Sequence, residues 1–446
     1  MTTSPERYDA IVIGGGPAGA TGALVMARQG LRVLVAERER FPRFHIGESA
    51  LPRNLTLLRD LGLEEAFRAI PQIDKRGAEF AMGDGGFSQL FHFNTGLLDG
   101  NSQAFNIERA PFDAMLLRAA RDAGATVVED RAVRRIRSLA DGAVEVELDG
   151  GEPVHASWLL DASGQATMLG KHLGIRQALP NLRKVSYFAH FEGVQRLPGD
   201  AGGFPTIVMC DEGWFWLIPI DERRTSVGLV ADSDLARRIG VPPERMLAWG
   251  IARCPLLLAR CAQAVGPETN QIAADFTYRC SPYAGPGYFL AGDAATFVDP
   301  IFSTGLCLAM MSAAEAARGV IAMIRQEARP ATVRRRYIRY VEESSRPFFE
   351  LVRLYYQHSF RELFLDGQGP LAVHRAVLTV LTGAVFPRPA YALRWRLRLF
   401  ALFVRLNRYI PLATRRQRFS LLAGSQPAAA SPEGELAERQ PLREAG

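Results

Sequence analysis

Residues 8–19 of this chain read YDAIVIGGGPAG, and they decide its fold. The apolar half predicts a buried strand, and the glycine-rich half predicts a tight turn at the start of a helix over residues 20–29. A second strand is expected over residues 31–36, ending at Glu37. This order of strand, glycine turn, helix, strand and acid is typical of a dinucleotide-binding unit, in which Gly16 lets the backbone approach a pyrophosphate. The stretch therefore predicts an α/β, Rossmann-like domain.

The far end of the predicted domain indicates which dinucleotide binds. Residues 287–295, GYFLAGDAA, read as a buried strand that ends in Gly292 and Asp293, and an aspartate there can accept from a ribityl chain, which NAD lacks. A third strand over residues 156–160 runs into DASG at residues 161–164. Three such segments in this order resemble the FAD monooxygenase-like superfamily. The sequence holds no second glycine fingerprint for a nicotinamide, so electrons are expected from a separate flavin reductase.

The most unusual stretch is GWFWLIP at residues 213–219, which holds two of the five tryptophans. Alternate side chains of an extended strand share a face, so Trp214, Trp216 and Ile218 are expected to line one side of a sheet. A turn and a second strand over residues 225–230 complete a predicted hairpin. An isolated pair of tryptophans in a strand is ordinarily core packing, and its meaning here depends on the other motifs.

Four segments together carry a closer resemblance. They are HIGESALP at residues 45–52, DKRGAEF at residues 74–80, the tryptophan strand, and DPIFSTG at residues 299–305. The combination resembles the flavin-dependent halogenases, especially those that act on carrier-protein-bound substrates. That family uses reduced FAD, oxygen and chloride or bromide to make hypohalous acid, which travels to a lysine beside the substrate. The resemblance implies a two-component halogenase of an electron-rich aromatic or conjugated substrate.

The resemblance also implies which residues form the site. Catalytic roles fall to four residues, with the tryptophans dividing flavin from substrate: Lys75, Glu48, Trp214 and Trp216. A halide ion is expected at Thr304 and Gly305, because residues 306–325 predict a helix whose N-terminus favours anions; the same feature would stabilise reduced flavin. No metal site is implied. The expected FAD-binding residues are Gly14, Gly16, Ala18, Gly19, Glu37, Arg43, Ser49, Arg109, Gly292, Asp293, Pro300 and Gly305.

Lys75 has chemistry that favours the functional interpretation. The chain contains three lysines against fifty arginines. A desolvated amine can lose its proton and react with hypohalous acid, whereas a guanidinium remains charged. The alternative is an ordinary solvated lysine that follows a helix. Glu48 has a comparable alternative, as a capping or salt-bridging carboxylate ahead of a helix over residues 51–61.

Two residues depart from the family pattern. Phe302 stands where tryptophan halogenases have a catalytic glutamate, which argues against free tryptophan as the substrate and favours the carrier-protein branch. Met82 stands where a tryptophan usually follows the lysine motif. This second departure keeps an FAD hydroxylase or a polyprenyl-type reductase open as an alternative. A flavin-containing protein that only docks on a membrane or a carrier protein is a further one.

The domain organisation follows from the order of the motifs. An FAD-binding domain is expected to be interleaved with an antiparallel-sheet substrate domain, followed by helices. The FAD-binding parts are residues 1–75, 105–164 and 276–330, and the substrate parts are residues 76–104 and 165–275. A helical basic region covers residues 331–423, and a disordered tail is expected over residues 424–446.

The C-terminal third is strongly basic. Between residues 371 and 430 there are ten arginines and no acidic residue. Residues 393–409 predict a helix with arginines on one face and apolar residues on another, which can rest on anionic lipid, dock an acidic carrier protein, or cap the substrate cavity. An aromatic helix is expected over residues 348–360. No nucleic-acid-binding pattern is present, and five cysteines without paired spacing indicate a reducing cytoplasm, with peripheral membrane contact left open.

Overall fold

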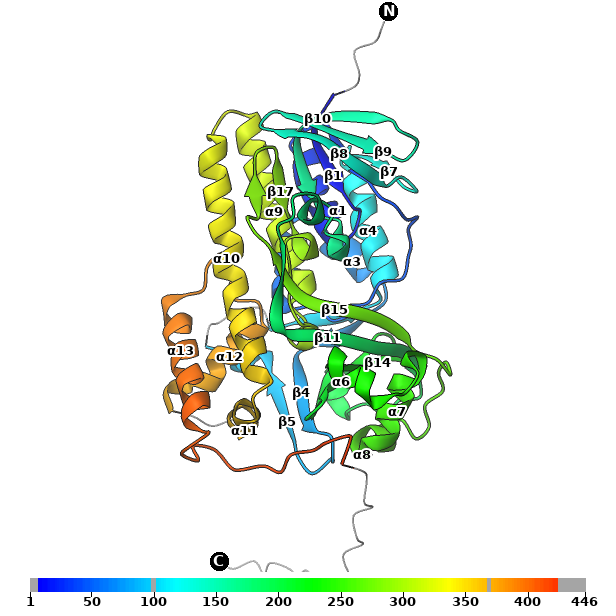
Figure 1. Ribbon diagram of the computed structural model, residues 1–446, viewed down its shortest axis with the longest axis vertical. Helices are drawn as coiled ribbons and strands as arrows, with labels where there is room; N and C mark the ends of the chain where they lie inside the picture. Colours follow the sequence, from blue (N-terminus) through cyan, green and yellow to red (C-terminus); the bar gives the residue numbers. More distant parts are fainter. Residues whose placement is uncertain (1–6, 98–101, 367–369, 424–446) are drawn as a thin grey trace, which may run out of the picture.

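Two large sheets and a helical unit make up the molecule, for which a computed structural model describes residues 7–97, 102–366 and 370–423. One sheet lies in the upper half of Figure 1, the second lies below it, and the C-terminal helices flank the second sheet. The polypeptide passes between the two sheets several times, which agrees with the interleaving expected from the sequence. The predicted fold class is confirmed.

The first sheet contains the glycine fingerprint. Strand β1 (Arg7–Ile13) lies at its centre and pairs in parallel with β2 (Val33–Ala36) and β10 (Pro153–Asp161). Parallel strands buried on both faces read as continuous apolar runs, as β1 and β2 do. The remaining strands are β7 (Thr126–Val128), β8 (Val133–Ala140), β9 (Ala143–Leu148), β16 (Ala284–Gly285) and β17 (Tyr288–Leu290).

Helices cover this sheet and join it to the rest of the chain. Helix α1 (Pro17–Ala27) packs against both α4 (Arg109–Asp122) and α9 (Gly305–Ile324). Helix α9 agrees with the helix predicted from the sequence. It is the one helix in the described part of the chain that is long and apolar enough to cross a membrane, but 67% of its apolar window is buried inside the fold. Its composition is therefore explained by core packing.

The second sheet has the order β18-β15-β11-β14-β13-β12-β4-β5 and is antiparallel except where β12 pairs with β4. The tryptophan strand is β13 (Gly213–Pro219), which lies between β12 (Thr206–Cys210) and β14 (Arg224–Asp232) and confirms the predicted hairpin. The other strands are β4 (Gly77–Met82), β5 (Ser88–His92), β11 (Arg176–Glu192), β15 (Gln271–Cys280) and β18 (Thr296–Phe297).

Shorter elements connect the two sheets. A two-stranded sheet pairs β3 (Gln72–Lys75) with β6 (Ala104–Ile107), and it places Lys75 opposite Ala104. The helices near the sheets are α2 (Pro52–Asp60), α3 (Glu64–Arg68), α5 (Met168–His172), α6 (Ser233–Ile239), α7 (Met246–Arg253) and α8 (Pro255–Arg260). The short helix η1 (Phe93–Thr95) follows β5.

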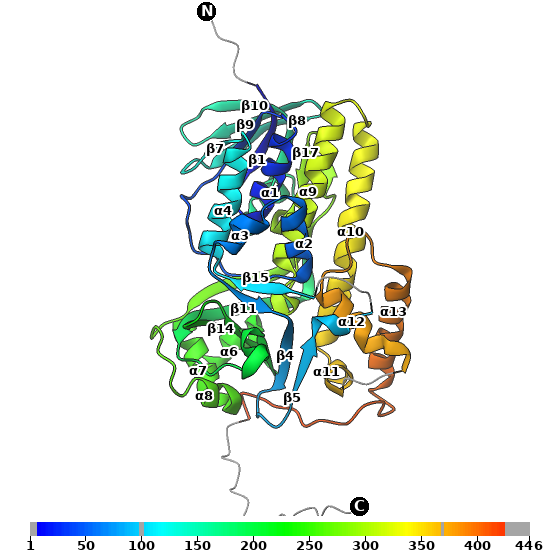
Figure 2. The same cartoon turned by 180° about the vertical axis from the view of Figure 1, so that it is seen from behind.

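The C-terminal unit contains α10 (Pro330–Tyr355), α11 (His358–Asp366), α12 (Val373–Leu381) and α13 (Tyr391–Leu406). Seen from behind in Figure 2, α12 lies close to β4 and β5, and α13 lies outside it. The prediction of one continuous aromatic helix over residues 348–360 is wrong, because α10 ends at Tyr355 and the chain turns before α11 begins at His358. That turn places Tyr356 where its hydroxyl meets Asp299. The expected disordered tail lies outside the described residues.

Candidate functional site

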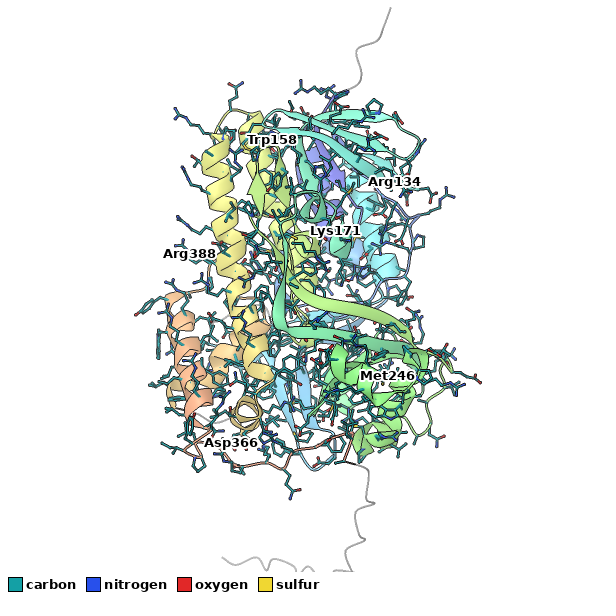
Figure 3. All side chains as sticks on the ribbon, in the orientation of Figure 1. Arg134, Trp158, Lys171, Met246, Asp366 and Arg388 are labelled. Atoms are coloured by element: carbon teal, nitrogen blue, oxygen red, sulfur yellow. The ribbon has the colours of Figure 1, made fainter. Side chains whose placement is uncertain are left out.

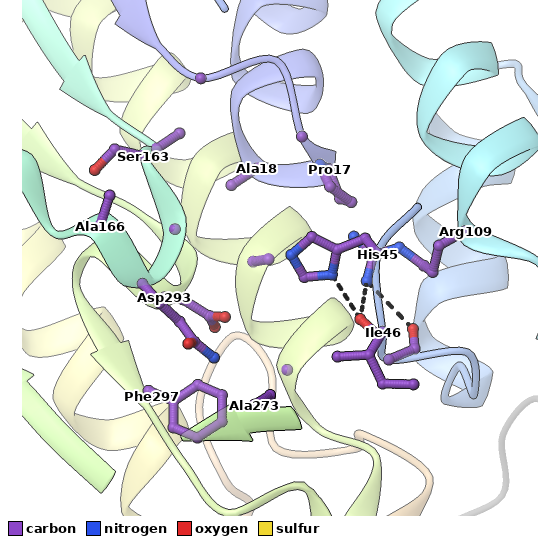
Figure 4. Close-up of a pocket in the computed structure, with 18 of the residues that line it drawn as sticks. Pro17, Ala18, His45, Ile46, Arg109, Ser163, Ala166, Ala273, Asp293 and Phe297 are labelled. Carbon is purple, nitrogen blue, oxygen red and sulfur yellow. Dashed lines mark hydrogen bonds between the residues drawn. The ribbon is translucent and has the colours of Figure 1, made fainter. Parts of the chain in front are cut away.

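A cavity of about 1080 Å³ opens between the two sheets. Figure 4 shows Pro17 and Ala18 of the α1 start at its upper edge, with His45 and Arg109 on one side and Asp293 and Phe297 across from them. Thirteen of the residues predicted from the sequence line it: Gly14, Gly16, Ala18, Glu37, Arg43, Glu48, Ser49, Arg109, Trp214, Trp216, Asp293, Pro300 and Gly305. The cavity therefore unites the fingerprint, the tryptophan strand and the turn before α9.

The upper part of the cavity fits FAD. Helix α1 begins at the cavity, and its N-cap residue Gly16 supplies no side-chain cap for the first free N–H groups. Such a helix start binds pyrophosphate through backbone N–H groups and the helix dipole. A Cβ atom at Gly16 would approach only the Arg43 guanidinium, 3.3 Å away, so the space beyond this glycine is open to a ligand. Both carboxylate oxygens of Glu37 accept backbone N–H groups, from Gly15 and Glu39.

A buried ion pair holds the loop that forms one side of the cavity. Arg109 makes a bidentate contact with Asp113, at 2.8 and 2.9 Å, and its remaining nitrogen donates to the carbonyl oxygens of Ile46 and Gly47. This arrangement fixes residues 45–47 beside the cofactor space. Desolvation within the loop, together with the positive charge of Arg109, lowers the pKa of His45 to about 4, although the residue keeps an accessible surface.

The paired tryptophans form an indole wall. The rings of Trp214 and Trp216 lie 5.8 Å apart between centroids, and both side chains are buried. Each indole N–H has an acceptor: Trp216 donates to Ser226, and Trp214 donates to Tyr356. Hydrogen-bonded, buried indoles are held in one orientation, so the wall is rigid.

Lys75 lies behind Ser49 and does not itself line the cavity. Its ammonium group donates to Ser49 Oγ at 2.8 Å and to the carbonyl oxygen of Ala50 at 3.0 Å, and it faces the ring of Phe93. No carboxylate in the described parts of the chain pairs with it. Burial lowers the pKa of Lys75 to about 7, so a large fraction of this amine is neutral near physiological pH. The alternative of a solvated surface lysine is wrong.

Glu48 has a partner that the sequence did not suggest. His190 of β11 lies 2.7 Å from Glu48 Oε1, and Oε2 of this buried carboxylate has no hydrogen-bond partner among the described residues. Burial alone would lower the pKa of His190, but the neighbouring carboxylate of Glu48 outweighs it and raises the pKa. One oxygen of Glu48 therefore lies beside His190, and the other has no partner among the described residues at the cavity edge.

A second polar chain joins the indole wall to the turn before α9. The hydroxyl of Tyr356 accepts from Trp214 Nε1 at 3.2 Å and donates to Asp299 Oδ2 at 2.5 Å, while Asp299 Oδ1 caps the backbone of Ile301. The turn and the wall thus keep a fixed geometry. Thr304 Oγ1 in that turn is buried and has no hydrogen-bond partner in the described structure.

Three predicted residues stand apart from the cavity lining, in addition to Lys75: Gly19, Gly292 and Thr304. Gly19 acts through packing, because a Cβ atom there would overlap the carbonyl oxygen of Gly14. The sequence reasoning missed His45, His190 and Tyr356. His45 sits inside a recognised motif and could have been found, whereas the other two meet their partners only through tertiary pairing.

Comparison with known proteins places the chain among flavoenzymes. A family model described as FAD binding domain matches residues 7–344. A 1H-pyrrole-2-carbonyl-[peptidyl-carrier protein] brominase from Pseudoalteromonas luteoviolacea is 33% identical over 71% of this chain and 77% of its own length. The chain belongs to the flavin-dependent halogenases. The enzyme therefore uses FAD together with a halide, and neither the hydroxylase nor the reductase alternative is favoured.

Other relatives support the same family. A 1H-pyrrole-2-carbonyl-[peptidyl-carrier protein] chlorinase from Pseudomonas fluorescens is 29% identical over 79% of this chain and 84% of its own length. The flavin-dependent halogenase armH4 of Armillaria mellea is 32% identical over 72% of this chain, which spans 66% of that relative. The solved structure of the flavin-dependent brominase Bmp2 superposes with a TM-score of 0.80 and 29% identity, over 90% of this chain and all of that one.

The indole wall gives a first testable prediction. Gly228 of β14 lies opposite Trp216, and a Cβ atom there would overlap the indole ring. Gly228→Ala is therefore expected to displace the Trp216 ring without removing it. Because small misplacements at a reaction site are costly, the halogenated product per reduced FAD consumed should fall on the order of 10- to 100-fold.

The control for this substitution is Ser226→Ala. It removes only the hydroxyl that accepts from Trp216 and leaves room for the ring. Product yield should fall less in this variant than in Gly228→Ala, because the ring loses one hydrogen bond but keeps its space. Full coupling of flavin oxidation to product in Gly228→Ala would show that the position of Trp216 does not matter.

Proposed function

We propose that the enzyme halogenates an electron-rich acyl group held on a carrier protein, with 1H-pyrrole-2-carbonyl as the first candidate. The observation that carries the proposal is the buried amine of Lys75, which reaches Ser49 of the cavity edge on one side and Phe93 on the other. Two relatives named as pyrrole-carrier-protein halogenases support the substrate class. Phe302 supports it as well, because it packs against Tyr355 at the position where a glutamate would favour free tryptophan.

The residues would divide the work as follows. Bound reduced flavin, supplied by a separate reductase, would activate oxygen to oxidise the halide. Glu48, held by His190, would place a carboxylate oxygen beside the cavity for a proton transfer. Trp214 and Trp216 would keep the substrate away from the flavin. Lys75 would orient or carry the electrophilic halogen, which requires its neutral form and a position shielded from water.

Thr304 and Gly305 would hold the halide. The free N–H groups at the α9 start, the helix dipole and the unpartnered Thr304 hydroxyl all favour an anion there. Thr304→Val keeps the shape of the side chain and removes one donor to an ion. Since such a hydrogen bond contributes about 1.5–3 kcal/mol, the KM for chloride or bromide should rise roughly 10- to 100-fold.

The halide prediction is checked by measuring rate against halide concentration. FAD affinity and the rate at saturating halide should stay near the wild-type values in Thr304→Val. An unchanged halide KM together with weaker FAD binding would mean that this turn serves the flavin and not the halide.

The proposed function is tested with a peptidyl carrier protein loaded with a 1H-pyrrole-2-carbonyl thioester. The enzyme receives reduced FAD from a reductase, oxygen, and either bromide or chloride, and the intact mass of the carrier protein is measured. Replacement of hydrogen by halogen, dependent on the halide, is the expected result. A hydroxylated or unchanged acyl group, with the flavin oxidised, would contradict the proposal.

A further inference from the structure

Helix α13 presents a row of arginines that no other part of the described structure neutralises. Arg394, Arg398, Arg405 and Arg408 lie on the exposed side of the helix and of the turn that follows it, and we refer to them as the basic stripe. Within the described ranges, no carboxylate lies at ion-pair distance from any of the four. The described segment from residue 370 to residue 423 contains no acidic residue at all. A single-sign surface of this kind attracts a partner of the opposite charge.

The opposite face of α13 is already used inside the protein. Leu393, Leu397, Phe400 and Val404 are buried in the main core, as the sequence periodicity predicted. A helix that inserts into a bilayer interface needs its apolar face free for lipid. Helix α13 keeps its larger apolar face inside the fold, and four arginines dominate the surface that remains, which suits electrostatic contact with a protein.

Apolar side chains lie beside the stripe at its C-terminal end. Leu402, Leu406, Tyr409 and Ile410 are exposed, with Tyr409 82% accessible. Arginine and aromatic residues are the types enriched at protein interfaces, and an apolar centre beside matched charges is the usual anatomy of such a contact. Helix α13 lies at the outer edge of the molecule in Figure 3.

The stripe is on the Lys75 side of the fold. Helix α13 packs on α12, and α12 packs on η1. Phe93 of η1 faces the Lys75 ammonium, and Thr379 of α12 accepts from the backbone N–H of Leu97 just beyond η1. A partner seated on α13 is therefore separated from Lys75 by one helix and one turn of chain.

We propose that the basic stripe docks the acidic surface of a carrier protein, which then presents its acyl group on the Lys75 side. The inference rests on the proposed function for its substrate and adds the surface that recognises the partner. Opposite charges steer association and set the orientation of the complex, so binding should weaken as salt concentration rises.

The test is a triple charge reversal, Arg394→Glu with Arg398→Glu and Arg405→Glu. The chain offers a matched control on α10: Arg335, Arg339 and Arg346 have the same spacing, are exposed, and form no ion pair with a described residue. Their triple change to glutamate alters the net charge by the same amount. A triple change of the stripe to glutamine is the milder variant, and bound FAD reports whether each protein is folded.

Two probes are used: the pyrrole-2-carbonyl thioester on a peptidyl carrier protein of net negative charge, and the same acyl group on pantetheine alone. In the stripe variants, kcat/KM for the carrier-bound probe should fall at least about tenfold, while kcat/KM for the pantetheine probe stays unchanged. The α10 variant should match the wild type on both probes. The Kd of the carrier protein, measured without turnover, should rise in parallel.

Several outcomes would overturn the docking proposal. Equal losses in the stripe and α10 variants would indicate a general effect of charge. An unchanged Kd in the stripe variants would place the contact elsewhere. Cosedimentation of the wild type with phosphatidylglycerol vesicles, lost in the stripe variants while the carrier protein Kd is unchanged, would make the stripe a lipid contact. If the wild type modifies neither probe yet binds the carrier protein through the stripe, the proposed function fails and the docking surface stands.

Discussion

Replacing Lys75 by alanine is expected to lower the halogenation rate on the order of 10²- to 10⁴-fold while FAD remains bound. The amine is buried, lies 2.8 Å from Ser49 Oγ and has no carboxylate partner in the described structure, so nothing nearby can take over its role. Lys75→Arg should be as inactive as Lys75→Ala, because a guanidinium remains protonated and cannot offer a free amine. The measurement is product formed per minute at saturating halide and reduced FAD.

The control for this substitution is Lys184→Ala. Lys184 is also buried, faces the ring of Tyr356 and lies 3.8 Å from Asp232, but it is not in contact with the cavity edge. Its removal should cost less activity than the removal of Lys75, because Lys184 meets the indole wall only through Tyr356. Equal halogenation by wild type and Lys75→Ala would remove the lysine from the mechanism, and equal losses in both lysine variants would show a general cost of emptying a buried site.

The pH dependence follows from the pKa of Lys75. Burial lowers it from the ordinary value of 10.5 to about 7, so the neutral fraction and the halogenation rate should rise with pH through 7. In the unfolded chain the amine stays protonated up to pH 10.5. Below pH 7 the folded protein has to bury a protonated amine, which lowers the free energy of unfolding. This loss of stability disappears as the pH approaches 10.5. Lys75→Met should therefore melt at a higher temperature than wild type near pH 6.5, with a gap that closes toward pH 10.5. A gap independent of pH would contradict this.

Gly16→Ala is expected to abolish FAD binding without unfolding the protein. Gly16 has an extended backbone, with φ of −65°, and a Cβ atom there meets only the end of the Arg43 side chain. The methyl group would instead fill the space that a pyrophosphate needs at the α1 start. Flavin affinity should drop at least about 100-fold, since both close approach and hydrogen bonding to backbone N–H groups are lost.

Gly19→Ala provides the contrast. A Cβ atom at Gly19 would overlap the carbonyl oxygen of Gly14, and backbone cannot move aside as a flexible side chain can. This variant should lose stability as well as flavin, visible as a lower melting temperature of the apoprotein. If Gly16→Ala bound FAD normally, the phosphates would not lie at the α1 start.

Local patterns were sufficient to predict several parts of the fold. The β1–α1–β2 unit, the tryptophan hairpin and α9 could be predicted because each is encoded by contiguous periodicity and turn residues. The buried face of α13 could be predicted for the same reason. The break after Tyr355 was missed, because aromatic and aliphatic residues recur on both sides of it and no glycine or proline marks the turn.

The environment of the site residues was less accessible to sequence reasoning. Lys75 could be chosen from its motif, but its buried position depends on Ser49, Ala50 and Phe93, which come from other segments of the chain. Glu48 meets His190, and Trp214 reaches Asp299 through Tyr356, across similarly long separations. Pairings of this kind are set by sheet register and helix packing, and a single sequence carries no local signal for them.

The account depends most on hypohalous acid being consumed inside the protein, between the indole wall and Lys75. Its most direct test is bromination of the carrier-bound pyrrole-2-carbonyl group in a large excess of free methionine, which scavenges hypohalous acid in solution. Product formation by the wild type should be unaffected by methionine, because the oxidant never leaves the interior. A proportionate loss of product as methionine increases would show that the oxidant escapes to solvent, and it would contradict the account.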